Sequence, residues 1–257
     1  MIVTTAGRTN EQMIQTARKI ANDLGYHYYQ RNKKSIGAIS EERQQDVLVI
    51  GKNRYEWYRL GEADPVFFHP NTAAFRAKRW QKGEVEPFLL ATDLNTGMSF
   101  LDCTLGLASD SIMASMATGE HGQVTGVEGN KLLAYLVKTG LKNWESDIGQ
   151  MNEAMKRIKV LEGKHQHILT SLPENSFDVV YFDPMFENQI KESNGISPLR
   201  KVAVYDELTE QTILDAKRVA RNRIVLKDHW QSERFGKFGF TVNKRKTAKF
   251  HYGYLKT

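Results

Sequence analysis

The stretch DCTLGLASD, residues 102–110, decides the fold class of this 257-residue chain. It follows an apolar run and leads into a helical pattern, so it lies at the carboxyl end of a strand, where open α/β sheets bind ligands. Gly106 lets the backbone turn tightly and approach a ligand, and Asp102 and Asp110 supply acceptors for a cationic amino group. An ordinary strand-to-helix turn, with Asp110 near the helix N-terminus, explains the same residues equally well. Phosphate binding fits poorly, because the glycine patterns GxGxxG and GxxxxGK[ST] are missing and two carboxylates would repel an anion.

Around this stretch, apolar strands alternate with helical patterns. The expected strands are 98–103, 123–128, 158–162, 177–183 and 223–227. The expected helices between them are 109–118, 130–140, 146–157 and 207–221. Strands separated by helices predict a doubly wound, mostly parallel sheet covered on both faces. The end of the chain, 238–255, has two β-rich runs with no helix between them, which indicates an antiparallel hairpin at the edge of this sheet.

The first 90 residues have a pattern of their own. We expect a strand at 2–5, a helix at 11–24 that stops at Gly25, a strand at 46–50 and a basic helix at 72–83. The prediction is a small N-terminal α/β domain over 1–90, with a possible RNA contact. A larger domain follows over 91–257.

Composition and charge narrow the function classes. The chain is 40% hydrophobic and its single cysteine, Cys103, excludes an intramolecular disulfide and a cysteine-cluster zinc site. It contains neither a long apolar span nor a signal-peptide pattern, so we expect a cytoplasmic protein without a membrane partner. The net charge of +6 is uneven: +4 over 1–90, −8 over 91–216 and +10 over 217–257. Basic ends favour an anionic partner such as nucleic acid, although many soluble proteins are mildly basic without one.

Glu128 ends the strand that follows the opening stretch. It lies 22 residues beyond Gly106, a spacing at which a carboxylate accepts hydrogen bonds from ribose hydroxyls. This spacing indicates a nucleoside-containing cofactor without naming it. The alternative is an acid that stabilises the start of the next helix.

The sharpest motif is VVYFDPMF, residues 179–186. Its strand ends in Asp183, and Pro184 stops the strand so that Met185 and Phe186 project over the ligand crevice. The motif resembles the Asp/Asn-Pro-Pro-aromatic motif of methyltransferases that act on the amino groups of nucleobases. An exocyclic base amine is a poor nucleophile, and a carboxylate and a carbonyl that accept its hydrogens favour the geometry needed for attack. An aromatic ring stacks on a base removed from its helix. We therefore predict a catalytic Asp183, Pro184 and Phe186, with Met185 and Phe186 on the substrate; a plain strand-terminating turn is the alternative.

Together, the three motifs resemble the RsmJ-like family of class I S-adenosylmethionine (SAM) methyltransferases, which methylate a guanine amino group of small-subunit ribosomal RNA. The resemblance covers residues 96–230, and DPMF is its most specific part. It implies SAM as cofactor and a Rossmann-like fold. The cofactor contacts expected from the motifs and the resemblance are Asp102, Thr104, Gly106, Ser109, Asp110, Glu128, Gly129, Lys164, His165 and Asp183.

Several positions depart from the family pattern. Ala108 stands where the family has a second glycine, and Ser109 and Gly129 replace arginines. Lys164 and His165 replace small hydroxyl residues. Ala108 is compatible with the turn if its φ stays negative.

Other residues complete the predicted site. Lys227 follows the last parallel strand and faces the same crevice, and Arg76 and Arg79 on the basic helix resemble RNA contacts; a solvated helix face is the alternative. The long connection 187–204 is interpreted as a lid. His165 and His167 would share one face of a strand, but without carboxylate or cysteine partners they do not predict a metal site.

The preferred function is methyl transfer from SAM to the exocyclic amine of a guanine in small-subunit ribosomal RNA, with the RNA or the small ribosomal subunit as partner. Two alternatives stay open. In the first, the methyl group is transferred to a DNA base or a small amine. In the second, the chain is a non-catalytic RNA-binding protein on a methyltransferase fold.

Overall fold

The computed structural model describes residues 1–184 and 207–257. The chain divides into two compact units, one formed by 1–69 and the other by the described residues from 70 onward. The second unit thus includes the segment 70–90, in which one helix packs on a helix of this unit and the next reaches its sheet. The connection 187–204, expected as a lid, lies outside the described residues, as do Met185 and Phe186.

The first unit is a four-stranded sheet in the order β2-β1-β3-β4. Its elements are β1 (Ile2–Thr5), α1 (Glu11–Leu24), β2 (His27–Tyr28), α2 (Ile36–Arg43), β3 (Val47–Ile50) and β4 (Tyr55–Tyr58). β1 pairs in parallel with β2 and β3, and β4 is antiparallel. α1 begins at Asn10, whose side chain accepts from the Met13 N–H, and ends at Gly25 with φ of 73°. Ile39 of α2 packs against alternate residues of β1 and β3, which closes the core on that face.

The second unit is a seven-stranded sheet in the order β10-β11-β9-β8-β5-β6-β7. Its strands are β5 (Ser99–Asp102), β6 (Gln123–Glu128), β7 (Lys159–Glu162), β8 (Phe177–Phe182), β9 (Ala220–His229), β10 (Thr241–Asn243) and β11 (Phe250–Lys256). The first five are parallel, while β11 is antiparallel to both β9 and β10. The predicted doubly wound sheet with a closing antiparallel hairpin is confirmed.

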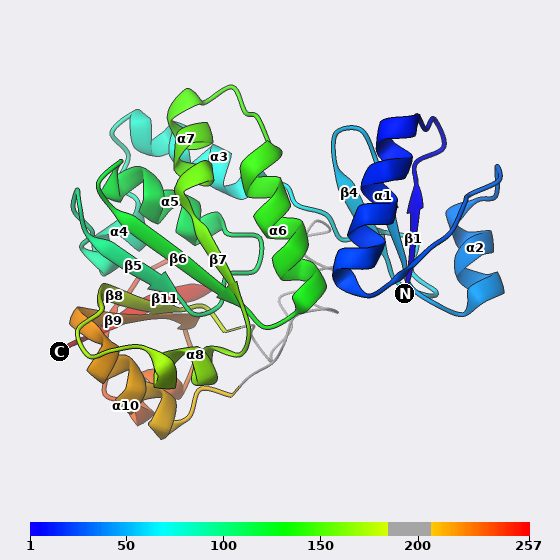
Figure 1. The fold of residues 1–257 in the computed structure, drawn as a ribbon. Helices are drawn as coiled ribbons and strands as arrows, with labels where there is room; N and C mark the ends of the chain where they lie inside the picture. Colours follow the sequence, from blue (N-terminus) through cyan, green and yellow to red (C-terminus); the bar gives the residue numbers. More distant parts are fainter. Residues whose placement is uncertain (185–206) are drawn as a thin grey trace. The chain divides into compact units, whose positions relative to one another are not determined.

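Helices cover both faces of this sheet (Figure 1). They are α3 (Asn71–Gln81), α4 (Pro87–Thr92), α5 (Ser109–Thr118), α6 (Lys131–Asn143), α7 (Gly149–Arg157), α8 (His165–Ser171), α10 (Glu210–Val219) and α11 (Arg234–Lys237). α3 to α7 pack on one face, and α8 and α10 on the other, where they close a large apolar core. Among the described helices, none is long and apolar enough to cross a membrane.

The register of the central strands defines the site. Asp102 of β5 lies beside Tyr181 of β8 on one side and Gly126 of β6 on the other. Because carboxyl ends of parallel strands meet at one edge, Asp102, Glu128 and Asp183 are brought to the same edge of the sheet.

Candidate active site

The loop between β5 and α5 is held by Asp102. One oxygen of this carboxylate accepts from the Thr104 N–H at 3.0 Å, and the other accepts from the Ser111 hydroxyl at 2.7 Å. The side chain lies beneath the loop, and burial raises its pKa to about 7. Asp102 thus supports the loop from below, while the direct cofactor contact expected of it stays a prediction.

Two small residues let this loop lie close to the sheet. Gly106 has φ of 50°, the left-handed conformation that favours glycine. A side chain at Gly126 would come within 2.3 Å of Leu105, so the absence of one lets Leu105 pack over β6. These contacts place the loop backbone against the carboxyl ends of the strands.

Ala108 does not meet the condition stated for it, that φ stay negative. Its φ is +63°, so the alanine adopts the left-handed conformation. The side chain is fully buried, and the residue precedes the first turn of α5. A left-handed alanine costs about 1 kcal/mol, a strain that the packing of this loop must offset.

Glu128 lies at the end of β6 and reaches the loop. Its Oε2 accepts from the Gly106 N–H at 3.1 Å, and its Oε1 accepts from the Asn130 N–H at 2.9 Å. Burial raises the pKa of this carboxyl, opposed by hydrogen bonds from Asn130, Gly106 and Gly129. A carboxylate has about four lone-pair sites, and these three N–H groups occupy three of them, so Glu128 retains capacity to accept from a ribose hydroxyl.

Asp110 forms the centre of a buried ion-pair network. It accepts from Arg76 at 2.7 Å, the Tyr181 hydroxyl at 2.9 Å and Lys227 at 3.3 Å. Burial acts to raise its pKa, but Lys227 and Arg76 outweigh burial and hold the pKa of Asp110 well below its ordinary value. Three donors already occupy this carboxylate, so its geometry favours a structural role over acceptance from a cofactor ammonium group.

Asp183 follows β8 and is tied to the same loop. Its backbone N–H donates to the Thr104 hydroxyl at 2.6 Å, and its Oδ2 accepts from Lys227 at 2.5 Å. The side chain is 27% exposed, so the carboxylate is partly accessible to solvent. Burial raises its pKa, with Asp110 adding to the rise and Lys227 opposing it. Asp183 is therefore poised to accept a proton at the edge where the loop lies.

Arg76 and Arg79, both expected as RNA contacts, differ in their surroundings. Arg76 turns inward and bonds to Asp110, Glu86 and the Ser109 hydroxyl. It brings a guanidinium beside Ser109, the position at which the resembling family has an arginine. Arg79 stays on the surface and pairs with Glu84.

The third predicted contact region belongs to a helix. Lys164 immediately precedes α8, and His165 is its first residue. The imidazole of His165 is buried with its ring 5.7 Å from that of Phe182. The strand geometry expected for His165 and His167 is therefore wrong. Among the described residues, no group of three or more His, Cys, Asp or Glu side chains could hold a metal.

Sequence reasoning missed three partners of this network: Tyr181, Ser111 and Glu86. Tyr181 lies inside the apolar strand pattern, and Ser111 lies on a helix face that carried no charge signal. Glu86 precedes a helix too short to show periodicity. Only the polar character of Ser111 and Glu86 near a ligand motif could have indicated them.

The arrangement suits a cationic nucleoside cofactor. Glu128 offers acceptors for a ribose, Gly106 and its neighbours offer close backbone approach, and the acidic edge favours a positive charge. Asp183 stands beside this space as an acceptor for a second molecule. The donors that would bind phosphate in a glycine-rich loop are lacking here, because Glu128 occupies the Gly106 N–H.

Comparisons with known proteins agree with this geometry. Residues 32–250 match the model of a family described as "Putative SAM-dependent methyltransferase". The chain is 50% identical to the uncharacterized protein YpiP of Bacillus subtilis, over 100% of this chain and 99% of that protein. Ribosomal RNA small subunit methyltransferase J of Psychrobacter arcticus is 25% identical over 71% of this chain and 62% of its own length. The corresponding protein of Buchnera aphidicola is 26% identical over 73% and 77%.

Solved structures share the fold. The SAM-dependent methyltransferase NGO1261 from Neisseria gonorrhoeae aligns with a TM-score of 0.61 and 17% identity, covering 100% of this chain and 96% of that chain. At this identity the likeness concerns the fold alone.

Proposed function

Because the chain belongs to the SAM-dependent methyltransferase family whose model spans most of its length, we propose that it methylates the exocyclic amine of a guanine in small-subunit ribosomal RNA. One observation carries the proposal. Asp183 directly follows the carboxyl end of β8, and its backbone N–H donates to the Thr104 hydroxyl in the loop between β5 and α5. The distant relatives named ribosomal RNA small subunit methyltransferase J support RNA of the small ribosomal subunit as the substrate.

SAM is the cofactor, and it supplies a methyl group activated on a sulfonium. On this side of the site, we assign Glu128 to a ribose hydroxyl and the backbone around Gly106 to close contact with the cofactor. Gly129, Lys164 and His165 stay predicted contacts at the neighbouring strand ends. Ser109, held by Arg76, completes this set of predicted contacts.

On the acceptor side, Asp183 orients the amine. Lys227 occupies its Oδ2, and Oδ1 accepts a hydrogen of the guanine amine. The Pro184 carbonyl accepts the other hydrogen, and Phe186 stacks on the base. The amine nitrogen would then form a bond to the methyl carbon while the bond between this carbon and sulfur breaks. The electron pair of the broken bond would stay on sulfur. The nitrogen loses one proton, which Asp183 receives; its raised pKa suits this role.

The first unit offers a surface for the RNA backbone. The loops that follow β1, β2 and β3 carry Arg8, Lys33 and Lys52 at the carboxyl edge of the parallel strands. All three are exposed, and their side chains make no ion pair or hydrogen bond to a residue in 1–184 or 207–257. Such a cationic edge binds phosphates without reading sequence.

The experiment is methyl transfer from labelled SAM to small ribosomal subunits, naked small-subunit RNA, transfer RNA, DNA and small amines. The proposal expects label in the small-subunit RNA, on guanine N2. Label confined to DNA or a small amine would assign the other acceptor class. SAM binding without transfer to any acceptor would favour the non-catalytic alternative.

A further inference from the structure

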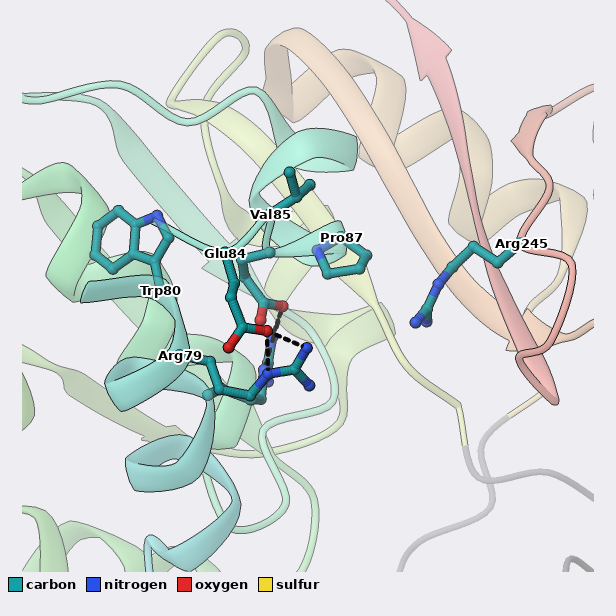
Figure 2. A pocket seen from close by; sticks show the side chains of 8 residues that line it. Arg79, Trp80, Glu84, Val85, Pro87 and Arg245 are labelled. Carbon is teal, nitrogen blue, oxygen red and sulfur yellow. Dashed lines mark hydrogen bonds and ion pairs between the residues drawn. The ribbon is translucent and has the colours of Figure 1, made fainter. Parts of the chain in front are cut away.

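Helix α3 presents aromatic and basic side chains on its surface. Phe75 is 64% exposed, and the guanidinium of Arg79 lies over its ring at 5.7 Å from the centroid. Arg79 and the nearby Trp80 also line a pocket of about 140 Å³. Pro87 and Arg245 line another side of this pocket. Figure 2 shows Arg245 extending from the C-terminal hairpin toward the segment that connects α3 and α4.

A chain of contacts joins this pocket to the candidate active site. The Lys227 ammonium, which holds Asp183, lies 5.2 Å from the centroid of the Phe250 ring. The Arg245 guanidinium lies 5.1 Å from the centroid of the same ring. The Phe250 ring therefore lies between Lys227, which pairs with Asp183, and Arg245 of the pocket.

Some polar side chains that line the pocket are not fully engaged by other described residues. Arg76, which also lines it, is committed to Asp110 and Glu86. Arg79 pairs with Glu84, but both side chains are about half exposed, and such pairs exchange partners at little cost. Within the described part of the chain, Arg245 pairs with no carboxylate, and the Trp80 indole N–H has no acceptor.

Aromatic rings beside an arginine without an ion-pair partner among the described residues, Arg245, and a loosely paired one, Arg79, suit single-stranded nucleic acid. Bases stack on aromatic faces whatever their identity, and arginine adds phosphate and cation–π contacts. A duplex hides its base faces and would use the cations alone. A base that enters a methyltransferase site must also leave its own stack, which holds the flanking strand open.

We propose that Phe75, Arg79, Trp80, Arg245 and Phe250, here called the aromatic-basic strip, bind the single-stranded RNA that flanks the target guanine. Trp80 and Phe75 stack on flanking bases, and Arg245 binds the phosphate next to the target nucleotide. The inference rests on the proposed RNA substrate and extends it: the target lies in an unpaired segment.

The test uses the full-length protein with Trp80→Ala and Arg245→Gln. Leu214→Ala removes an apolar side chain from the surface of α10, where it is more exposed than Trp80, and Lys246→Gln removes one charge from the same hairpin turn as Arg245. Binding of a fluorescein-labelled single-stranded oligoribonucleotide is measured by anisotropy against its duplex form. Transfer kinetics are measured on small-subunit RNA.

The expected result is a 5- to 20-fold, order-of-magnitude loss of single-strand affinity in each strip variant, with SAM affinity unchanged and both control variants like the wild type. The KM for RNA rises accordingly, while kcat changes less. Only Arg245→Gln lowers the salt dependence of binding, since it removes the phosphate contact.

Strip variants that bind single strands like their controls would overturn the inference, as would equal losses for single strand and duplex. The proposed function fails differently. If ribosomal RNA accepts no methyl group while Trp80→Ala still weakens single-strand binding, the strip stands and the acceptor is wrong.

Discussion

The two units each contain a sheet with parallel central strands, and the loops at the carboxyl ends of these strands carry opposite charges in the two units. In the first unit, the strand-end loops hold Arg8, Lys33 and Lys52. In the second, the strand ends hold Asp102, Glu128 and Asp183. The comparison teaches that strand direction determines where a ligand binds, while the loop side chains determine which ligand it is. An acidic edge suits a sulfonium cofactor, and a cationic edge suits an RNA backbone.

The largest effect is expected at the acidic edge. Asp183→Ala removes both the acceptor and the proton carrier, so transfer should fall by roughly 10³-fold, while SAM affinity stays within a few-fold. Asp183→Asn keeps a hydrogen-bond acceptor but cannot take the proton. Its rate should lie between those of the wild type and of Asp183→Ala. Single-turnover transfer measures both. Normal turnover by the alanine variant would remove Asp183 from the mechanism.

Lys227→Met tests the cation between the two carboxylates. Without it, the pKa of Asp183 rises further, because burial and Asp110 are no longer opposed. The carboxylate form is then lost at higher pH, so the acid limb of the rate profile should move up in pH, with about a 10²-fold loss of rate near neutrality. The transfer rate is measured as a function of pH and divided by the fraction of the protein that is folded. This correction is needed because breaking a buried ion pair also destabilises the protein.

A matching Lys256→Met variant removes a lysine from the exposed end of β11 and should leave the pH profile in place. An unshifted acid limb in Lys227→Met would show that the lysine does not control Asp183.

Glu128→Ala should weaken SAM binding about 10- to 100-fold, because hydrogen bonds from the ribose to a charged acceptor are lost. Glu162→Ala is the control: it lies opposite Glu128 at the end of the next strand, but is exposed. Calorimetry with SAM measures both. Equal affinities would show that the acidic edge does not hold the ribose.

The cationic edge should show a smaller effect. Lys33→Gln combined with Lys52→Gln should weaken RNA binding about 5-fold and reduce its salt dependence, with SAM affinity unchanged. The pair Lys19→Gln and Arg59→Gln removes the same charge from elsewhere in the first unit. If both pairs behave alike in an RNA titration at several salt concentrations, the loss reflects net charge and not this edge.

The smallest effect concerns the conformation of the acidic edge's loop. Ala108→Gly should raise the free energy of unfolding by up to about 1 kcal/mol, because glycine relieves the left-handed alanine. Ala114→Gly, in the middle of α5, should lower it by a similar amount. Urea unfolding compares the two, and a destabilised Ala108→Gly would contradict the strain.

Much of the fold follows from local patterns. The strands ending at Asp102, Glu128 and Asp183 were predicted within a residue or two because buried parallel strands appear as continuous apolar runs. The helices α4 and α8 were missed because they are too short for a periodic pattern.

The candidate site was harder to predict, because its partners come from distant segments. Asp110 appeared as a cofactor acceptor, but Arg76, Tyr181 and Lys227 all approach it from other elements. Similarly, the φ of Ala108 depends on how its loop packs, which local sequence does not reveal. Linear motifs indicated the edge, and only tertiary contacts showed that Asp102 and Asp110 are held by partners within the protein.

The central claim is tested most directly by mapping methylated nucleotides in small-subunit ribosomal RNA from cells that contain the active protein or its Asp183→Ala variant. The account predicts one guanine with a methyl group on N2 that is present with the active protein and missing with the variant. Identical methylation in both would contradict it.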